Sequence, residues 1–169
     1  MQHLCLCGPC APRLAGKLFS ALNVQPVGLR ILPFSVDGQP RGDALFLQPP
    51  PGLNGVPCRI RITPEETVTV PRALEDVAAP GLRAAMRLHA PMLLCGLTAD
   101  LLASDAFRQA VCDCLQGDIP LVIAADEASR TTLEALLPAD VQLWMDVPEV
   151  SDAQDALLEQ LIYEAALRF

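Results

Sequence analysis

The stretch Leu4-Cys5-Leu6-Cys7-Gly8-Pro9, followed by a helix-like segment, decides the fold of this chain of 169 residues. Residues 3 to 7 form an apolar run that ends at Gly8, which predicts a short buried strand and then a tight turn. Between residues 13 and 22, leucines recur at fourfold spacing, at Leu14, Leu18 and Leu22. This spacing predicts a helix with one apolar face. The chain therefore opens with a strand, a turn and a helix.

A turn of this kind binds phosphate when several backbone N–H groups and the helix dipole point at one anion. A lysine then contacts the terminal phosphates, and a Ser or Thr hydroxyl holds magnesium. When the sequence is aligned to that motif without gaps, Leu14 replaces the lysine and Ala15 replaces the hydroxyl. A second alignment uses Gly16-Lys17, but seven residues then separate Gly8 from Gly16, where the motif has four, and Leu18 offers no oxygen.

The loop is also short of N–H donors, because proline has none and two prolines lie in it. The candidate contacts for a nucleotide or small anion are the loop residues and the two cations beside them: Gly8, Pro9, Cys10, Ala11, Pro12, Arg13 and Lys17. Since neither the lysine nor the hydroxyl is in its place, we expect no catalytic residue and no metal site, and binding of nucleotide with magnesium is disfavoured.

Further segments follow in an order that is typical of one known family. They are Val27-Gly28-Leu29-Arg30, a hairpin-like stretch around Asp37-Gly38, Pro91-Met92-Leu93-Leu94-Cys95, residues 104–111 and residues 119–124. Over nearly its whole length, the chain resembles the small P-loop nucleoside-triphosphatases of the cancer-related type. In that family the loop runs Gly-Pro-Pro-Gly and then Gly-Lys-Thr-Thr, and the Walker B strand ends in Asp-Glu. Here the last two positions are Gly96 and Leu97.

The resemblance implies a three-layer α/β fold, with a mostly parallel sheet, helices on both faces and an inserted β-hairpin. It implies nucleoside-triphosphate hydrolysis as the activity of the family, yet this chain lacks the groups that compensate charge on the transferred phosphoryl group. We therefore expect a non-hydrolysing nucleotide-binding, anion-binding or regulatory module. Two alternatives remain: a weak nucleoside-triphosphatase that uses Lys17 through a rearranged loop, and a protein-interaction or oligomerisation domain that presents the hairpin and the proline-rich loop at 49–57.

The rest of the chain alternates between strand-like and helix-like segments, which favours a parallel sheet with helices on both faces. A turn signal at Asp37-Gly38-Gln39-Pro40 predicts a hairpin, residues 49–55 predict an exposed loop, and Ser151 is a plausible N-cap. Residues 63–66 either end a strand or start a helical turn. We expect strands at 27–34, 44–48, 59–63, 91–97, 121–125 and 141–146, and helices at 71–79, 80–88, 100–116, 130–137 and 151–167.

Composition excludes several classes of function. A net charge of -8 and a pI near 4.6 argue against a nucleic-acid partner and against an anionic membrane surface. No apolar run reaches the roughly 20 residues that cross a bilayer, and the first residues do not begin a secretory signal. Seven cysteines, an odd number, indicate a reducing compartment, so we expect a cytoplasmic protein. The length predicts a single domain over residues 1–169.

Cysteines, acidic residues and histidines offer other candidate sites. In a fold of this type the strand before Gly8 is expected next to the strand that ends at Cys95, which would bring three or four sulfurs of Cys5, Cys7, Cys10 and Cys95 together beside the loop, although buried cysteine is usually a small hydrophobe. Cys112 and Cys114 diverge on a helix, so they do not chelate together. We expect Asp126-Glu127 to start a helix or form a loop, and Asp100 to lie at a helix start. His3 and His89 are expected at the surface or at helix ends.

Overall fold

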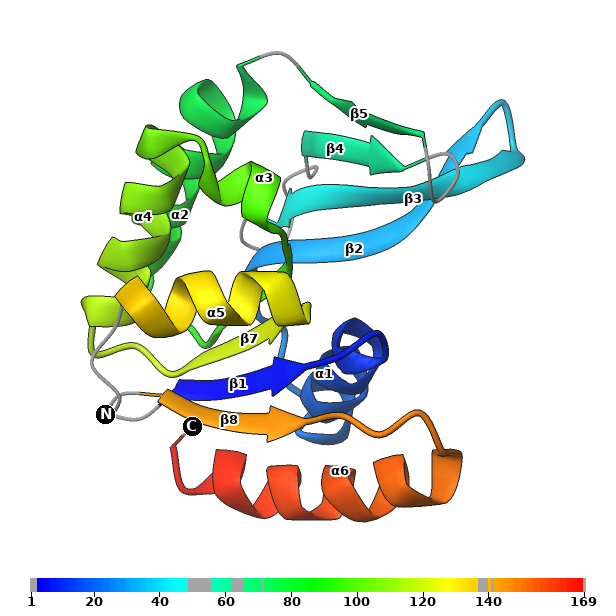
Figure 1. Cartoon of the computed structure of the whole chain (residues 1–169), viewed down its shortest axis with the longest axis vertical. Helices are drawn as coiled ribbons and strands as arrows, with labels where there is room; N and C mark the ends of the chain where they lie inside the picture. The colour runs from blue at the N-terminus through cyan, green and yellow to red at the C-terminus, as the bar shows by residue number, and fades with distance from the viewer. Residues whose placement is uncertain are drawn as a thin grey trace.

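A computed structural model of the chain describes residues 3–48, 56–61, 66–70, 72–136, 140 and 142–168 (Figure 1). The strands are β1 (His3–Cys7), β2 (Val27–Val36), β3 (Gln39–Gln48), β4 (Val56–Arg61), β5 (Thr67–Thr69), β6 (Met92–Leu97), β7 (Leu121–Ala125) and β8 (Gln142–Asp146). The helices are α1 (Ala11–Ala21), the π-helical turn η1 (Leu74–Ala78), α2 (Ala79–Met86), α3 (Ala99–Leu102), α4 (Asp105–Gln116), α5 (Glu127–Leu136) and α6 (Ser151–Ala166).

All the described strands form one mixed sheet in the order β5-β4-β3-β2-β6-β7-β1-β8. The five strands from β2 to β8 in that order run parallel, and β3, β4 and β5 extend the sheet with antiparallel pairing. The expected mostly parallel sheet with an inserted hairpin is therefore confirmed. The expected loop at 49–55 lies outside the described residues, as do residues 63–65 of the stretch 63–66, for which the sequence allows a strand end or a helical turn.

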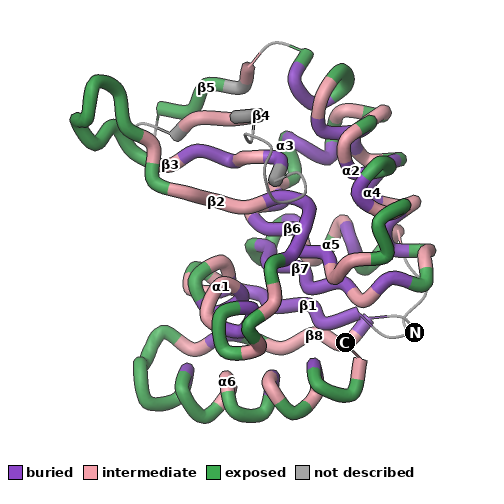
Figure 2. The backbone as a smooth tube through the Cα atoms, turned by 180° about the vertical axis from the view of Figure 1, so that it is seen from behind, coloured by how far each residue is buried: buried purple, intermediate pink, exposed green. Residues whose placement is uncertain are grey.

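Helices cover both faces of the sheet, which confirms the expected three layers (Figures 1 and 2). On one face, α1 and α6 bury residues such as Leu18 and Leu161 in one apolar cluster. On the other face, η1 and helices α2 to α5 pack residues such as Leu82, Phe107 and Leu133 in a second cluster. None of the described helices is long and apolar enough to span a membrane.

Strand β1 lies inside the sheet, and all five of its residues are buried. Its side chains alternate between the two layers, because Leu4 and Leu6 pack beside α1 and Cys5 packs beside α5. His3, expected at the surface or at a helix end, is instead 1% exposed, which corrects that prediction. Its Nε2 donates to the Leu115 carbonyl oxygen at 2.8 Å, and burial lowers its pKa. A histidine at a strand start becomes buried here because β7 and β8 flank β1 on both sides.

The hairpin is longer than expected, because its turn contains two residues rather than four. Asp37 (φ 50°) and Gly38 (φ 74°) both have positive φ, as in the two-residue turns that match the twist of a hairpin. Val36 therefore pairs directly with Gln39, and Pro40 lies within β3 opposite Ser35, next to a register shift. The tip of the hairpin is exposed and extends away from the body of the sheet (Figure 2).

Strand β5 was not expected, β4 begins at Val56 and not at 59, and α5 begins at Glu127 and not at 130. Other differences lie at helix boundaries. The expected helices at 71–79 and 80–88 correspond to η1 and α2, and α2 begins directly after η1. At the junction, Ala79 N–H donates to the Leu74 oxygen, which is the wide hydrogen-bonded turn of a π-helix. The next residue, Pro80, has no N–H to donate. The expected helix at 100–116 is divided into α3 and α4, because Ser104 adopts an extended conformation with ψ 117°. Val150, not Ser151, occupies the N-cap position of α6.

Close contact between β2 and β6 gives a test of this packing. Gly28 has φ +116°, and a Cβ there would lie 2.4 Å from the Leu93 carbonyl oxygen. We expect Gly28→Ala to lower the free energy of unfolding by about 2–4 kcal/mol through backbone strain and overpacking. Gly16→Ala is the matched control, because its Cβ meets nothing within 4 Å in α1, and we expect a gain of about 0.5–1 kcal/mol. Urea unfolding measures both, and equal stability of the two variants would contradict the packing of β2 on β6.

Candidate functional site

The turn after β1 is shorter than a phosphate-binding loop. β1 ends at Cys7 and α1 begins at Ala11, so three residues, Gly8, Pro9 and Cys10, connect them. The motif instead places four residues between its first glycine and the glycine that precedes the lysine. Pro12 lies in the first turn of α1, where a missing N–H is tolerated, and this lets the helix begin earlier than the expected residue 13.

Most backbone N–H groups between Gly8 and Leu14 are already hydrogen-bonded to carbonyl oxygens of the protein. Gly8 N–H bonds to the Ala125 oxygen of β7 at 3.1 Å, and Ala11 N–H bonds to the Gly8 oxygen at 3.1 Å. Leu14 N–H continues the helix by bonding to the Cys10 oxygen, and the two prolines have no N–H. Between Gly8 and Leu14, at most Cys10 and Arg13 can therefore offer a backbone N–H to an anion.

The exit of β8 closes the turn from the other side. Val147 N–H donates to the Cys7 oxygen at 2.8 Å, and a Cβ at Gly8 would lie 3.2 Å from the Val147 oxygen. Gly8 has φ +122°, a conformation that glycine adopts without strain. The turn is thus held between β7 and β8, and its backbone bends tightly instead of surrounding a phosphate group.

Neither predicted alignment brings a lysine to the turn. Leu14 and Ala15 are 1% and 0% exposed and belong to the apolar cluster under α1. Lys17 lies further along α1, and its Nζ is 3.4 Å from Asp155 of α6. Of the two cations expected beside the loop, Arg13 is the one in the first turn of α1, and it is exposed.

The end of β6, the Walker B-like strand, is also without a carboxylate. Gly96 has φ +73° and lies at a register shift between β6 and β7, where a Cβ would be 2.8 Å from Ile31 Cδ1. Leu97 is completely buried. Both positions therefore contribute to packing. The Ile31 side chain takes the space that a side chain at Gly96 would need, and the Leu97 side chain lies in the core.

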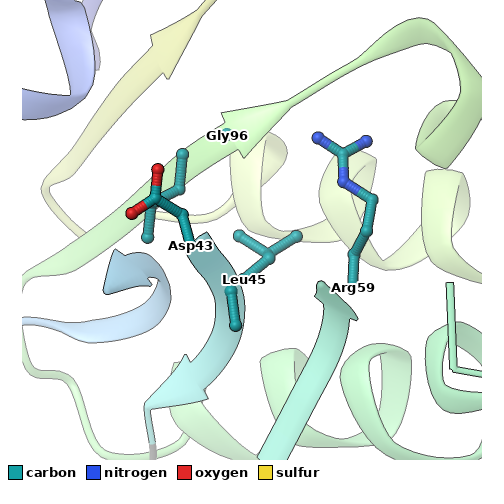
Figure 3. Close-up of a pocket in the computed structure, with 6 residues that line it drawn as sticks. Asp43, Leu45, Arg59 and Gly96 are labelled. Carbon is teal, nitrogen blue, oxygen red and sulfur yellow. The ribbon is translucent and has the colours of Figure 1, made fainter. Parts of the chain in front are cut away.

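A small cavity borders Gly96, with Leu45 between Asp43 and Arg59 (Figure 3). Its volume of about 30 Å³ is enough for a water molecule and too small for a nucleobase. The Arg59 guanidinium donates to Thr98 Oγ1 at 2.7 Å and lies 3.3 Å from Asp100 Oδ2. Asp100 is in the first turn of α3, as expected, so this carboxylate pairs with Arg59 and Thr98 at the helix start.

The expected adjacency of the first strand and the strand that ends at Cys95 is wrong, and the alternative in which their sulfurs meet is contradicted with it. Cys5 packs on the α5 side of the sheet, whereas Cys95 and Cys10 pack on the α1 side. The strand that ends near Cys95 is β6, and β7 separates it from β1. The six cysteines whose side chains the structure describes are free, and burial raises the pKa of Cys5 to about 12 and that of Cys95 to about 11. Cys112 and Cys114 lie on α4 as expected, and His89 is exposed beyond the end of α2.

Asp126 and Glu127 follow β7, the direct neighbour of β1, and have different roles. Asp126 Oδ1 accepts the Ser129 N–H at 2.8 Å, so it caps α5, in agreement with the predicted helix start. Ser129 Oγ in turn donates to the Leu97 oxygen at 2.9 Å and joins α5 to the end of β6. Glu127 instead lies against β1, where its Oε2 accepts the Cys7 thiol at 3.0 Å. Burial and this carboxylate raise the pKa of Cys7 to about 11.

Arg130 and Asp146 complete a polar group that the sequence analysis did not identify. The Arg130 guanidinium bonds to Asp146 Oδ1 at 2.8 Å and to Glu134 Oε1 at 2.9 Å, and it lies 5.3 Å from the centre of the Trp144 ring. The available signal was that Glu127 and Asp146 each stand at the carboxyl end of an apolar strand, where ligands bind in open α/β sheets.

The capping role of Asp126 can be tested directly. Asp126→Ala removes the acceptor for Ser129 N–H, so we expect the free energy of unfolding to fall by about 1 kcal/mol. Asp126→Asn keeps a capping oxygen and should retain the stability of the parent. Thermal unfolding compares them; a loss of the same size in both variants would show that the negative charge, and not the cap, is what matters.

The Arg59–Thr98–Asp100 group predicts a pH dependence. Burial alone would raise the pKa of Asp100, but the Thr98 hydrogen bond and the Arg59 charge outweigh burial and lower it. Asp100 therefore stabilises the fold above its unfolded pKa of about 3.9, and this contribution is lost as the pH falls through the lower folded value. Asp100→Asn should therefore reduce the change in the urea-unfolding midpoint between about pH 5 and pH 3, relative to the parent. Parallel profiles for the parent and Asp100→Asn would contradict the assignment.

Comparisons with known proteins support the fold. No family model matches the sequence, and no curated protein matches it. THEP1 from the hyperthermophile Aquifex aeolicus matches with a TM-score of 0.68 at 13% identity, over 97% of this chain and 98% of that chain. The solution structure of a human cancer-related nucleoside triphosphatase matches with a TM-score of 0.60 at 18% identity, over 98% of this chain and 97% of that chain. The predicted resemblance is thus confirmed for the fold: the chain has the α/β architecture of these two proteins over nearly all of its length.

Proposed function

We propose that this protein is a P-loop-like domain that does not hydrolyse nucleoside triphosphates and acts as a binding or regulatory module. The observation that carries the proposal is the closed turn at Gly8–Cys10, whose Gly8 N–H is bonded to Ala125. Phosphoryl transfer depends on donors already aimed at the developing charge. In this turn the corresponding donors are used to join β1 to β7 and to begin α1.

The ligands that would hold magnesium are also missing. Magnesium in this class of site is held by the loop hydroxyl and by a carboxylate at the end of the Walker B strand. Here Ala15 is in the core and β6 ends in Gly96 and Leu97. The nearest carboxylate after β6, Asp100, is bound to Arg59 and Thr98. No oxygen ligand thus remains at either of the two positions that hold the ion.

The first turn of α1 supports only a small anion contact. It combines the exposed Arg13 side chain, the helix dipole and at most two N–H groups, those of Cys10 and Arg13. Such a contact suits one phosphate group better than a triphosphate with its metal. We therefore propose that nucleotide binding, where it occurs, is weak and does not depend on magnesium.

The alternative of a weak nucleoside-triphosphatase requires Lys17 to leave Asp155 and move toward the turn. Lys17 lies beyond the first turn of α1, so this movement would require the start of the helix to unwind. The protein-interaction hypothesis stays a prediction; the exposed hairpin tip, where Val36 is 44% exposed, is the described part of the surface on which it depends.

Hydrolysis and binding assays test the proposal together. With ATP or GTP and Mg²⁺, we expect phosphate release at the background rate, for both the parent and Lys17→Ala. Isothermal titration should give the same weak affinity with Mg²⁺ and with a chelator, and Arg13→Ala should reduce it. Turnover that Lys17→Ala abolishes would instead establish the weak triphosphatase, and an affinity that rises with Mg²⁺ would refute the proposed absence of a metal-nucleotide site.

A further inference from the structure

Three parallel strands end side by side at the first turn of α5: β7, β1 and β8 (Figure 1). Each contributes one potential metal ligand. Cys7 is the last residue of β1, Glu127 begins α5 and is separated from the end of β7 by one residue, and Asp146 is the last residue of β8. The thiol sulfur and one oxygen of each carboxylate all lie within 4.8 Å of one another.

The sheet register is the reason that these side chains meet. Cys7 and Asp146 are partners in the parallel pairing of β1 with β8, so both side chains point to the α5 face. Glu127 reaches the same face from the other side of β1, with its Oε2 at 3.0 Å from Cys7 Sγ. Cys10, although close in sequence, packs on the opposite face beside α1. The group is therefore separate from the anion contact of the α1 N-terminus.

We propose that Cys7, Glu127 and Asp146 form a binding site for a thiophilic divalent cation such as Zn²⁺. Zinc binds cysteine sulfur at about 2.3 Å and carboxylate oxygen at about 2.0–2.2 Å, so its tetrahedral ligand atoms lie about 3.5 Å apart. One separation here is 3.0 Å and the others are at most 4.8 Å, so small movements of the two carboxylates bring the ligand atoms to that spacing. Cys7 is fixed in a strand and 2% exposed, while both carboxylate residues are exposed and can adjust.

The local charge favours a cation independently of the ligand geometry. Three carboxylates, Glu127, Glu134 and Asp146, interact with one guanidinium, Arg130, which gives a local charge of −2 with the thiol protonated. A divalent cation that displaces the thiol proton to solvent changes the local charge to −1. Arg130 also donates a hydrogen bond to Asp146 Oδ1, which is how outer residues orient a metal ligand.

The ligand types also determine which metal ion the site prefers and how many positions remain for other ligands. A thiolate ligand favours zinc over magnesium, which prefers oxygen ligands. Three protein ligands leave a fourth position, and the exposed carboxylates place it toward solvent, where a water molecule can complete the tetrahedron. This metal site differs from the four-sulfur arrangement considered from the sequence, because only Cys7 is shared between them.

Metal titration of the full chain tests the proposal. Zinc is titrated into metal-free protein in competition with a chromophoric chelator, and Co²⁺ is added separately to record thiolate-to-cobalt charge-transfer absorption. We expect one zinc ion per chain, no displacement by excess Mg²⁺, and a charge-transfer band that Cys7→Ala removes. Glu127→Gln, at an exposed position, should keep the fold and weaken zinc binding by about tenfold or more.

Cys10→Ala is the matched control, because it removes a nearby thiol that faces the other side of the sheet. It should leave both the zinc affinity and the cobalt spectrum unchanged. Circular dichroism of each variant without metal verifies that it is folded. Absence of stoichiometric zinc binding to the parent would overturn the proposal, as would unchanged affinity in both Cys7→Ala and Glu127→Gln. An equal loss in Cys10→Ala would also overturn it and assign the metal to the cysteines of the turn.

Discussion

Hydrogen bonds on both sides of the end of β1 constrain the rest of this structure. Gly8 N–H bonds to Ala125 of β7, and the Cys7 oxygen accepts Val147 N–H beyond β8. These contacts shorten the turn to three residues and fix the start of α1 at Ala11. A backbone donor that completes the sheet cannot also be presented to a phosphate group. The same contacts hold the ends of three strands together, and this places the Cys7, Glu127 and Asp146 group beside the turn.

The scaffold does not need a bound phosphate to be stable, because residues at the motif positions pack in its interior. Leu14 and Ala15 belong to the cluster between α1 and the sheet, and Leu97 belongs to the cluster on the other face. Gly96 allows Ile31 to approach the end of β6. Under the function proposed above, groups that would contact nucleotide are replaced in both halves of the site by groups that contact other parts of the protein. A complete three-layer fold then accompanies an incomplete site.

Local sequence patterns predicted the parallel strands well, because apolar runs such as residues 121–125 admit few alternatives to a buried strand. Boundaries failed where tertiary packing or backbone geometry decided them, as at the break at Ser104 and the two-residue turn at Asp37 and Gly38. The polar group at Cys7 was missed for another reason. Its nearest partner, Glu127, is 120 residues away, and the meeting depends on strand order and register, which residue types alone do not reveal.

Amide hydrogen exchange followed by NMR tests the central claim, that the turn is closed by its own backbone. The account predicts slow exchange at Gly8 N–H and Val147 N–H, because each is bonded to a carbonyl of a neighbouring segment. It also predicts that neither rate changes when magnesium and ATP are added. A Gly8 amide that exchanges as in an unstructured peptide, and becomes protected only with the metal nucleotide, would contradict the account and show an open phosphate-binding loop.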